Sequence, residues 1–347
     1  MKRRTSGCGW VLIAGLLLVG AAPSRARVSI LDLGTLPGGT VSLATAINQR
    51  GQIVGVSTVA SGETHAFLWE EGSMTDLGTL PSGSFSQGAG INDRAQVVGT
   101  ARTGSEEPHA FLWERGLMID LGTLSPGGLS VASGVNNRGQ VVGTAGPDAS
   151  QGAATPFVWQ RGVMIALIGL PGERAAAANG INNRGQVVGA SNDPKEFPRA
   201  VLWEGGRITV LQTPRGAVSS AAFAINDRDQ IVGEITMASG GPRASLWDAH
   251  GLFDLGPLAG GVFSIAVAIN NHGEAVGESD IPSNAIRAVL WAERTINDLG
   301  TIPGGVNSVA TSINDHGQVV GWSDTASGEP HAVLWTTRDR DNEHRDR

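Results

Sequence analysis

Histidine and arginine recur at one repeating position of this 347-residue chain, and both side chains can bind a charged ligand. His65 and His109 lie 44 residues apart, and each is followed by Ala-Phe. The equivalent positions further along are occupied by Thr155, Arg199, Arg243, Arg287 and His331. Three neighbouring arginines could hold a carboxylate or phosphate group through their planar guanidinium groups, whereas three neighbouring imidazoles could hold a metal ion. The competing interpretation is that these residues begin strands and pair with local acids such as Glu63, Glu107 and Glu329.

Two other residue types recur and offer chemistry. Aspartate precedes Leu-Gly at Asp32, Asp76, Asp120, Asp254 and Asp298. The sequence has no Asp-x-Asp-x-Asp-Gly calcium loop, so capping of backbone N–H groups is the preferred role for these carboxylates. Tryptophan recurs seven times, and the alternation Phe67-x-Trp69 favours core packing over a sugar-stacking surface. Trp322 stands outside this pattern and is a candidate exposed contact.

Motifs of the common catalytic sites do not occur in the sequence, which has no Gly-x-Ser-x-Gly, no phosphate-binding loop and no His-Glu-x-x-His. We therefore predict no catalytic residue and no cofactor. We also predict no metal site, because the histidines of successive repeats should lie too far apart to share one ion. The candidate ligand-binding residues are His65, His109, Arg199, Arg243, Arg287, His331 and Trp322.

These residues are positioned by an internal repeat that is centred on an asparagine. The asparagine recurs at Asn48, Asn92, Asn136, Asn182, Asn226, Asn270 and Asn314, with spacings of 44, 44, 46, 44, 44 and 44. Each period contains four segments typical of short strands, for example 45–48, 52–57, 65–69 and 74–77, separated by Gly or Pro. The Asn-x-x-Gly segment predicts a type I turn followed by a left-handed residue, with the Asn side chain bonded to its own turn. Ala95 and Asp229 replace that glycine in two copies.

The phase of the repeat discriminates between two architectures, a closed β-propeller and an open β-solenoid. Four strands in about 44 residues are the size of one propeller blade. The chain begins with a lone segment of the fourth-strand type, 29–33, and ends just after one of the third-strand type, 331–335. Seven complete blades exist only if residues 29–33 supply the outer strand of the last blade. We therefore predict an all-β fold, a seven-bladed β-propeller of 44-residue four-stranded repeats over residues 27–337, whose ring is closed by the N-terminal strand.

The repeated motifs resemble those of a known family, the HAF family of extracellular repeat proteins. The resemblance rests on the His-Ala-Phe tripeptides at 65–67 and 109–111, the Asp-Leu-Gly-Thr-Leu-Pro elements at 32–37 and 76–81, and Asn-Asp-x-Gly-Gln-Val-Val-Gly at 314–321. It extends over residues 29 to 336 and implies an exported repeat protein, without an assigned activity or catalytic residues. Copies three to six depart from the tripeptide at 155–157, 199–201, 243–245 and 287–289.

The N-terminal segment 1–26 matches a secretory signal peptide, with a basic start, an apolar stretch at 10–19 and small residues after it. The apolar stretch is shorter than the roughly 20 residues that span a bilayer, so we expect no membrane insertion after cleavage. Cleavage removes four basic residues and the one cysteine, Cys8, and changes the formal charge from -7 to -11. Because phosphate contacts need clustered cations, we expect no nucleic-acid partner. The charged segment 338–347 is expected to be a disordered tail.

The sequence therefore predicts an extracytoplasmic protein, which is secreted, periplasmic or at the cell surface. We expect a monomeric, non-enzymatic binding module for a glycan or a protein. The alternative is a hydrolase or lyase that acts on a polysaccharide from the central channel, and it would need carboxylates or histidines in the channel wall. The first strands instead offer small residues for that wall, namely Ala44, Ala46, Ala89, Ser133, Ala222, Ala224, Ala268 and Ser312.

Overall fold

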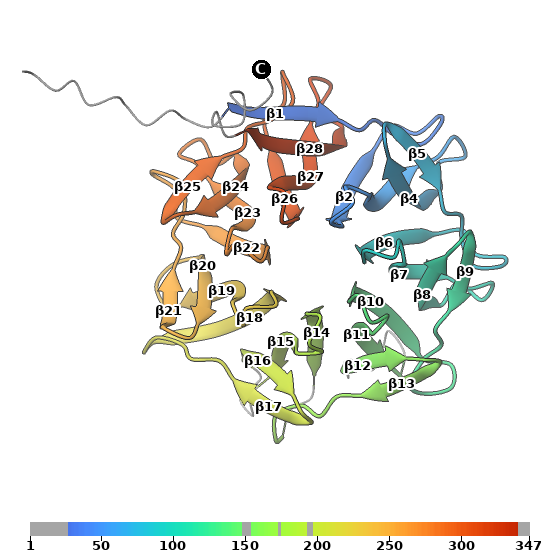
Figure 1. The fold of residues 1–347 in the computed structure, drawn as a ribbon, viewed down its shortest axis with the longest axis horizontal. Helices are drawn as coiled ribbons and strands as arrows, with labels where there is room; N and C mark the ends of the chain where they lie inside the picture. Colours follow the sequence, from blue (N-terminus) through green and yellow to red (C-terminus); the bar gives the residue numbers. More distant parts are fainter. Residues whose placement is uncertain (1–26, 148–153, 173–174, 193–196, 339–347) are drawn as a thin grey trace, which may run out of the picture.

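The computed structural model describes residues 27–147, 154–172, 175–192 and 197–338. Its 28 strands form seven antiparallel four-stranded sheets, arranged as blades around a central axis (Figure 1). The predicted seven-bladed β-propeller is therefore confirmed. Residues 1–26, where the signal peptide is predicted, and 339–347 of the predicted tail lie outside the described residues. No helix that could span a bilayer occurs within the ranges given above.

The blades follow one another in chain order. Blade 1 contains β2 (Ser42–Ile47), β3 (Ile53–Thr58), β4 (Thr64–Glu70) and β5 (Ser73–Asp76). Blade 2 contains β6 (Ser86–Ile91), β7 (Val97–Arg102), β8 (Pro108–Glu114) and β9 (Leu117–Asp120). Blade 3 contains β10 (Leu129–Val135), β11 (Val141–Gly146), β12 (Thr155–Gln160) and β13 (Val163–Ala166). Blade 4 contains β14 (Ala176–Ile181), β15 (Val187–Asn192), β16 (Pro198–Glu204) and β17 (Arg207–Val210).

Blade 5 contains β18 (Ala217–Ile225), β19 (Ile231–Met237), β20 (Pro242–Asp248) and β21 (Gly251–Asp254). Blade 6 contains β22 (Ser264–Ile269), β23 (Ala275–Asp280), β24 (Ile286–Ala292) and β25 (Thr295–Asp298). Blade 7 combines β26 (Ser308–Ile313), β27 (Gln318–Asp324) and β28 (Pro330–Arg338) with β1 (Arg27–Asp32) from the other end of the chain.

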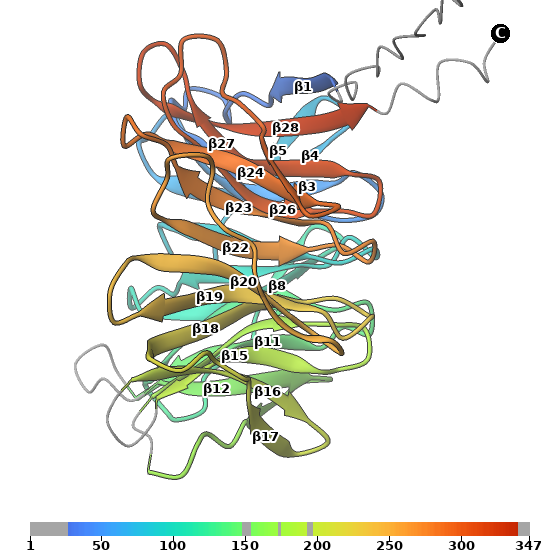
Figure 2. The same cartoon turned by 90° about the vertical axis from the view of Figure 1, so that its left-hand side faces the viewer.

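The N-terminal strand closes the ring, as predicted. β1 lies antiparallel beside β28, with Ile30 opposite Trp335 and Leu31 opposite Leu334 (Figures 1 and 2). The Leu33 N–H then donates to the carbonyl oxygen of Ala332 at 2.9 Å. The last blade therefore takes its outer strand from one end of the described chain and its three inner strands from the other.

The innermost strand of every blade contains a β-bulge, and in blades 1, 4 and 7 the side chain of the bulged residue donates a hydrogen bond to the next blade. In blade 1 the register shifts between Ala44 and Ala46. The bulged residue, Thr45, donates a hydrogen bond from its hydroxyl to the carbonyl oxygen of Gly88 in the next blade at 2.9 Å. The facing residue of β3, Gly55, has no room for a side chain, because a Cβ atom would collide with the carbonyl oxygen of Leu43. This explains the glycine of the repeated Val-Gly element.

The aromatic core differs between the two halves of the ring. In blades 1 to 3 the third strand buries a phenylalanine, which is Phe67, Phe111 or Phe157. Blades 4 to 7 carry Val or Ser at that position, and there the repeated tryptophan is buried instead, as Trp203, Trp247, Trp291 and Trp335. The indole N–H of Trp203 donates to the carbonyl oxygen of Ile168 in the preceding connection at 2.7 Å. The tryptophans thus pack in the core, and they replace the volume of the missing phenylalanine.

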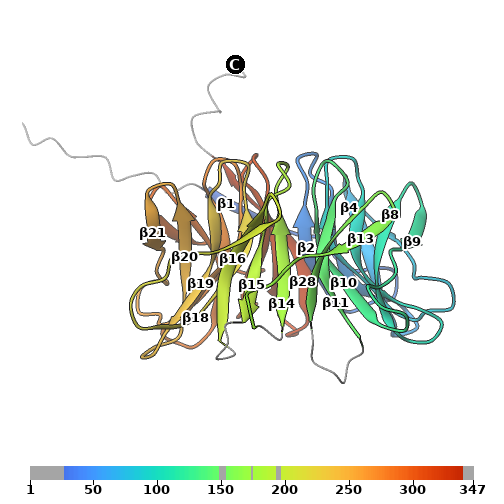
Figure 3. The same ribbon diagram turned by 90° about the horizontal axis from the view of Figure 1, so that it is seen from below.

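The strands run between two faces of the ring (Figure 3). We name the first the Asn-turn face, which carries the Asn turns between the first and second strands and the hairpin turns between the third and fourth strands. We name the second the connection face, which carries the loops between second and third strands and the links between blades. On the connection face, the link before a blade lies beside the end of that blade's second strand. In blade 1, the N–H of Thr40 in the link donates to the hydroxyl of Thr58 at the end of β3, at 2.9 Å.

Candidate functional site

The repeated asparagines form a closed ring of hydrogen bonds on the Asn-turn face. Asn48 Oδ1 accepts the N–H groups of Arg50 and Gln52 in its own turn, both at 3.0 Å, as predicted. Its Nδ2 also donates to the carbonyl oxygen of Asn92 in the next blade at 3.0 Å. All seven asparagines make this inter-blade bond at 2.9–3.1 Å, and the bond from Asn314 to Asn48 closes the ring. The repeat unit alone gave no sign of the inter-blade bond.

The left-handed turn residue is confirmed at the two copies that lack glycine. Gly51 has φ 77°, while Ala95 and Asp229 have φ 58° and 63°. A non-glycine residue at such a φ costs about 1 kcal/mol. Asp229 is held by neighbouring side chains, whereas Ala95 has only a methyl group at that point.

A second ring, formed by the residue after each asparagine, surrounds the channel mouth. Each of its backbone N–H groups donates to the side-chain oxygen of its equivalent in the next blade, at 2.7–3.0 Å. The members are Gln49, Asp93, Asn137, Asn183, Asp227, Asn271 and Asp315. They line a polar cavity of about 180 Å³. Each of the three aspartates also accepts a hydrogen bond from an amide nitrogen of a neighbouring blade, so these polar groups are used to join blades.

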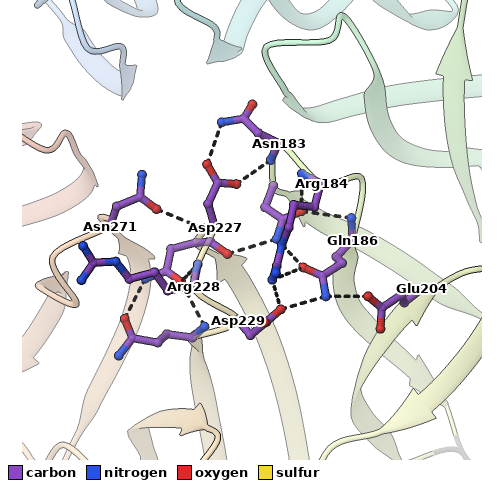
Figure 4. A network of polar contacts seen from close by, with 11 residues as sticks. Asn183, Arg184, Gln186, Glu204, Asp227, Arg228, Asp229 and Asn271 are labelled. Carbon is purple, nitrogen blue, oxygen red and sulfur yellow. Dashed lines mark hydrogen bonds and ion pairs between the residues drawn. The ribbon is translucent and has the colours of Figure 1, made fainter.

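Blades 4 and 5 carry a denser part of this network (Figure 4). Arg184 pairs with Asp229 of the next blade, and its guanidinium group also donates to Gln186 at 2.8 Å. Gln186 Nε2 in turn donates to Glu204 and to Asp229, both at 2.8 Å. The side chains point toward one another (Figure 4), so this cluster joins blades 4 and 5.

The repeated histidines lie toward the connection face, where each pairs with the aspartate of its blade's fourth strand. His65 Nδ1 lies 2.8 Å from the carboxylate of Asp76, whereas His65 Nε2 lies 4.0 Å from that of Glu63. The same pairs join His109 to Asp120 at 2.8 Å and His331 to Asp32 at 3.0 Å. The histidine partners are thus fourth-strand aspartates, and the predicted acids Glu107 and Glu329 are not their counterparts in these ion pairs.

Two of the predicted arginines make the same pair. Arg243 lies 3.1 Å from Asp254, and Arg287 lies 4.0 Å from Asp298. Arg199 occupies the equivalent position of β16, opposite Ser191. The charges of Arg243 and Arg287 are therefore offset within their own blades.

The five aspartates also cap the backbone, as the sequence analysis predicts. In each case a carboxylate oxygen accepts the N–H of the glycine two residues later, at 2.7–2.9 Å. Over the described parts of the chain, no three His, Cys, Asp or Glu side chains gather closely enough to hold a metal ion.

Two of the eight residues predicted for the channel wall are buried, and the other six are half-buried. Ala44 and Ala222 are fully buried against neighbouring blades and do not line the channel. The residue one step earlier in the strand is exposed in blades 2 and 3, as Gln87 and Val131, the latter 38% exposed. This position lies on the sheet face opposite to that of Ala44 and Ala222. The β-bulge prevents simple alternation along the whole strand from identifying that face.

Two carboxylates lie on this same side of blades 5 and 6. Glu234 is the cross-strand partner of Ala221, and Glu278 is the partner of Ile265, which occupy the position of Val131. Directly opposed side chains share one face of a sheet. Trp322, opposite Val309, holds the equivalent position in blade 7 and is half-buried. Blades 1 to 4 carry Val, Thr, Thr and Ala there, so the three large residues occupy one side of the ring.

Burial raises the pKa of both carboxyl groups. Desolvation raises the pKa of Glu234, and for Glu278 desolvation is joined by the charge of Glu234. A raised pKa means that the folded protein binds these protons more tightly than the unfolded chain does. Their contribution to stability is complete below the ordinary value of 4.5 and is lost as the pH rises through the raised values.

We therefore expect the double variant Glu234→Gln, Glu278→Gln to remove part of the pH dependence of stability. Its free energy of unfolding should exceed that of the parent at pH 7 to 8 and converge with it near pH 4, since neutral amides carry no desolvated charge. Chemical denaturation at several pH values measures this, with the exposed Glu71→Gln as control. A constant difference between parent and double variant at every pH would contradict the expectation.

A concave feature of mixed chemistry lies between blades 5 and 6. A groove of about 520 Å³ separates strand β21 from the β24–β25 hairpin. Its walls combine the aromatic rings of Phe253 and Trp291 with the charged groups of Asp248, Glu293 and Arg294. Phe253 is 40% exposed. An equivalent groove of about 280 Å³ lies between blades 3 and 4.

No protein-family model matches the sequence, and no curated protein is significantly similar to it. Solved structures share its fold. A puromycin-hydrolyzing peptidase of Mycobacterium tuberculosis matches with a TM-score of 0.60 and 14% identity, over 85% of this chain and 50% of that one. The β-propeller domain of the Trilobed protease from Pyrococcus furiosus matches with a TM-score of 0.52 and 9% identity, over 89% of this chain and 99% of that one.

An acylaminoacyl peptidase in complex with a chloromethyl ketone matches with a TM-score of 0.50 and 9% identity, over 83% of this chain and 50% of that one. This chain covers about half the length of these two peptidase chains. At such low identities the similarity shows the propeller fold alone. The Pyrococcus propeller is described as having an open velcro topology, whereas here β1 pairs with β28 and closes the ring.

Proposed function

We propose that this protein is an exported, monomeric binding module whose ligand is a glycan or a protein at the cell surface. The observation that carries the proposal is the groove between blades 5 and 6, which combines an exposed aromatic ring with donors and acceptors on a rigid scaffold. The predicted signal peptide supports export, and the motifs similar to the HAF family support an extracytoplasmic location.

Export and binding are tested separately. Intact-mass measurement of the exported protein should show a chain that starts between residues 23 and 27. The purified exported chain should then bind saturably to intact cells of the organism that encodes it. Binding that is linear with concentration, or a mature chain that retains Cys8, would contradict the respective part of the proposal.

A polysaccharide hydrolase or lyase is the alternative, and one observation favours it. The second strands of blades 5 and 6 carry two half-buried carboxyl groups with raised pKa at the same repeat position, which is the kind of residue that acid-base catalysis needs. Incubation with a panel of polysaccharides should then release new reducing ends or unsaturated ends. The Glu234→Gln and Glu278→Gln variants should each abolish that release. If the parent protein releases no such ends, the hydrolase or lyase alternative is wrong and the binding function stands.

A further inference from the structure

The hairpins that border the groove between blades 5 and 6 break the repeat. In blades 1 to 4 the second residue of the hairpin turn is glycine, at Gly72, Gly116, Gly162 and Gly206, all with positive φ. In blades 5 and 6 the same position holds His250 and Arg294, and both residues line the groove. The two departures from glycine therefore coincide with the largest groove between blades that we describe.

Arg294 occupies its position against the preference of its backbone. Its φ is 65°, and the preceding Glu293 has φ 50°. An L-residue other than Gly, Asn or Asp is strained in this region. Glycine would satisfy the turn without strain, as it does in four other blades. An arginine that is kept at a strained position beside a groove indicates a role in that groove.

The charges of the groove exclude strongly charged ligands. Asp254 is already paired with Arg243 at 3.1 Å, and its other oxygen accepts the Gly256 N–H. Asp248 and Glu293 line the groove together with Arg294 and His250. The backbone N–H of His250 donates to Asp248 Oδ1 at 2.7 Å. An anion would meet the two carboxylates, and a compact cation would meet the arginine. A neutral ligand that both donates and accepts hydrogen bonds fits both groups.

We propose that the groove between blades 5 and 6 binds a neutral saccharide unit. The hydroxyl groups of a sugar donate to the carboxylates of Asp248 and Glu293 and accept from the guanidinium group of Arg294. The C–H face of the ring packs on the exposed ring of Phe253, which is 40% exposed. The groove, of about 520 Å³, has room for such a unit. This inference rests on the proposed binding function and assigns its ligand class and its site.

Two variants of the full exported chain test the site. Phe253→Ala removes the aromatic surface, and Arg294→Gly removes the guanidinium group while restoring the residue that the turn prefers. Each should weaken saccharide binding about tenfold or more, which corresponds to the loss of one stacking or charged contact. Arg294→Gly should at the same time raise the melting temperature, so its loss of binding cannot come from unfolding. Ile165→Ala is the matched control, since Ile165 holds the position of Phe253 in the groove between blades 3 and 4.

The probe is an array of neutral, uronic-acid-containing and amino-sugar oligosaccharides, followed by titration of the best neutral one. Parent and Ile165→Ala should bind neutral members equally, and the two groove variants should not. Equal binding by all four proteins would overturn the groove as the site but leave a glycan-binding function. Selective binding of charged members would overturn the neutral class. Saturable cell binding without any array binding would overturn the inference and leave the proposed function with a protein ligand.

Discussion

Deletion of residues 27–33 is expected to abolish the cooperative folding of the ring. Leu33 is buried, and Val28 and Ile30 pack against the cluster that contains Trp335. A fully buried side chain of this size contributes about 1.5 to 3 kcal/mol, and the deletion also uncovers Trp335 and leaves the edge of β28 unpaired. Leu31 is 49% exposed and adds little. The summed loss consumes much of a typical total stability of about 5 to 15 kcal/mol.

The matched control is a circular permutant that moves the deleted strand to the other end. Arg27 lies opposite Arg338, just as Glu70 lies opposite Ser73 across a two-residue hairpin turn. Residues 27–34 placed behind Arg338 through an Asn-Gly linker should therefore complete blade 7 as an ordinary hairpin. Thermal unfolding should show a cooperative transition for the permutant and none, or one at far lower temperature, for the deletion.

Hydrogen exchange of the deletion variant can contradict the closure of the ring by β1. If the ring closes through β1, amides of residues 308–338 should lose protection, although they lie at the opposite end of the sequence. In an open solenoid only the first repeat would fray. Unchanged protection of β26, β27 and β28 would therefore rule out closure by the N-terminal strand.

The fold could be predicted from the sequence because the same motifs recur with a nearly constant period of 44 residues. The spacing of the asparagines gives the number of blades, and the lone first strand at 29–33 together with the last third strand at 331–335 gives the closure. The predicted strand bounds of blade 1 differ from those of β2 to β5 by one to three residues at every end. Strand ends depend on contacts between blades, which a single repeat does not contain.

The burial of the first-strand residues could not be predicted in the same way. The prediction assumed that alternate residues of the first strand share one face, but the bulge at Thr45 shifts the register between Ala44 and Ala46. The carboxylates of Glu234 and Glu278 were missed because they belong to second strands. One signal was present in the sequence, since these two glutamates and Trp322 follow one another at the same repeat position. The groove between blades 5 and 6 needs two adjacent blades, and only the missing glycines at His250 and Arg294 marked it.

The ring of asparagines leads to the second large expected effect, a stability loss of about 3 kcal/mol or more for Asn136→Ala. Asn136 is 3% exposed. Its Oδ1 accepts the N–H groups of Arg138 and Gln140, and its Nδ2 donates to the carbonyl oxygen of Asn182 in the next blade. Alanine leaves the two turn N–H groups without this acceptor, and each orphaned buried group costs about 1 to 3 kcal/mol. The Asn182 carbonyl loses the inter-blade bond but still accepts the Gly185 N–H at 3.1 Å.

The variant Asn136→Asp distinguishes the role of this asparagine in its own turn from its role in the contact between blades. Asn136→Asp keeps an acceptor for the two turn N–H groups but turns the Nδ2 donor into an oxygen that faces the Asn182 carbonyl and Gln140 Oε1. If the inter-blade bond matters as much as the turn, aspartate should be at least as destabilising as alanine, with an excess that falls at low pH because a protonated carboxyl can donate again. Urea unfolding of both variants measures the two losses, with Arg138→Ala in the same turn as control. An Asn136→Asp variant as stable as the parent would show that the asparagine serves only its own turn, and that the ring of seven inter-blade bonds adds nothing to the cohesion of the propeller.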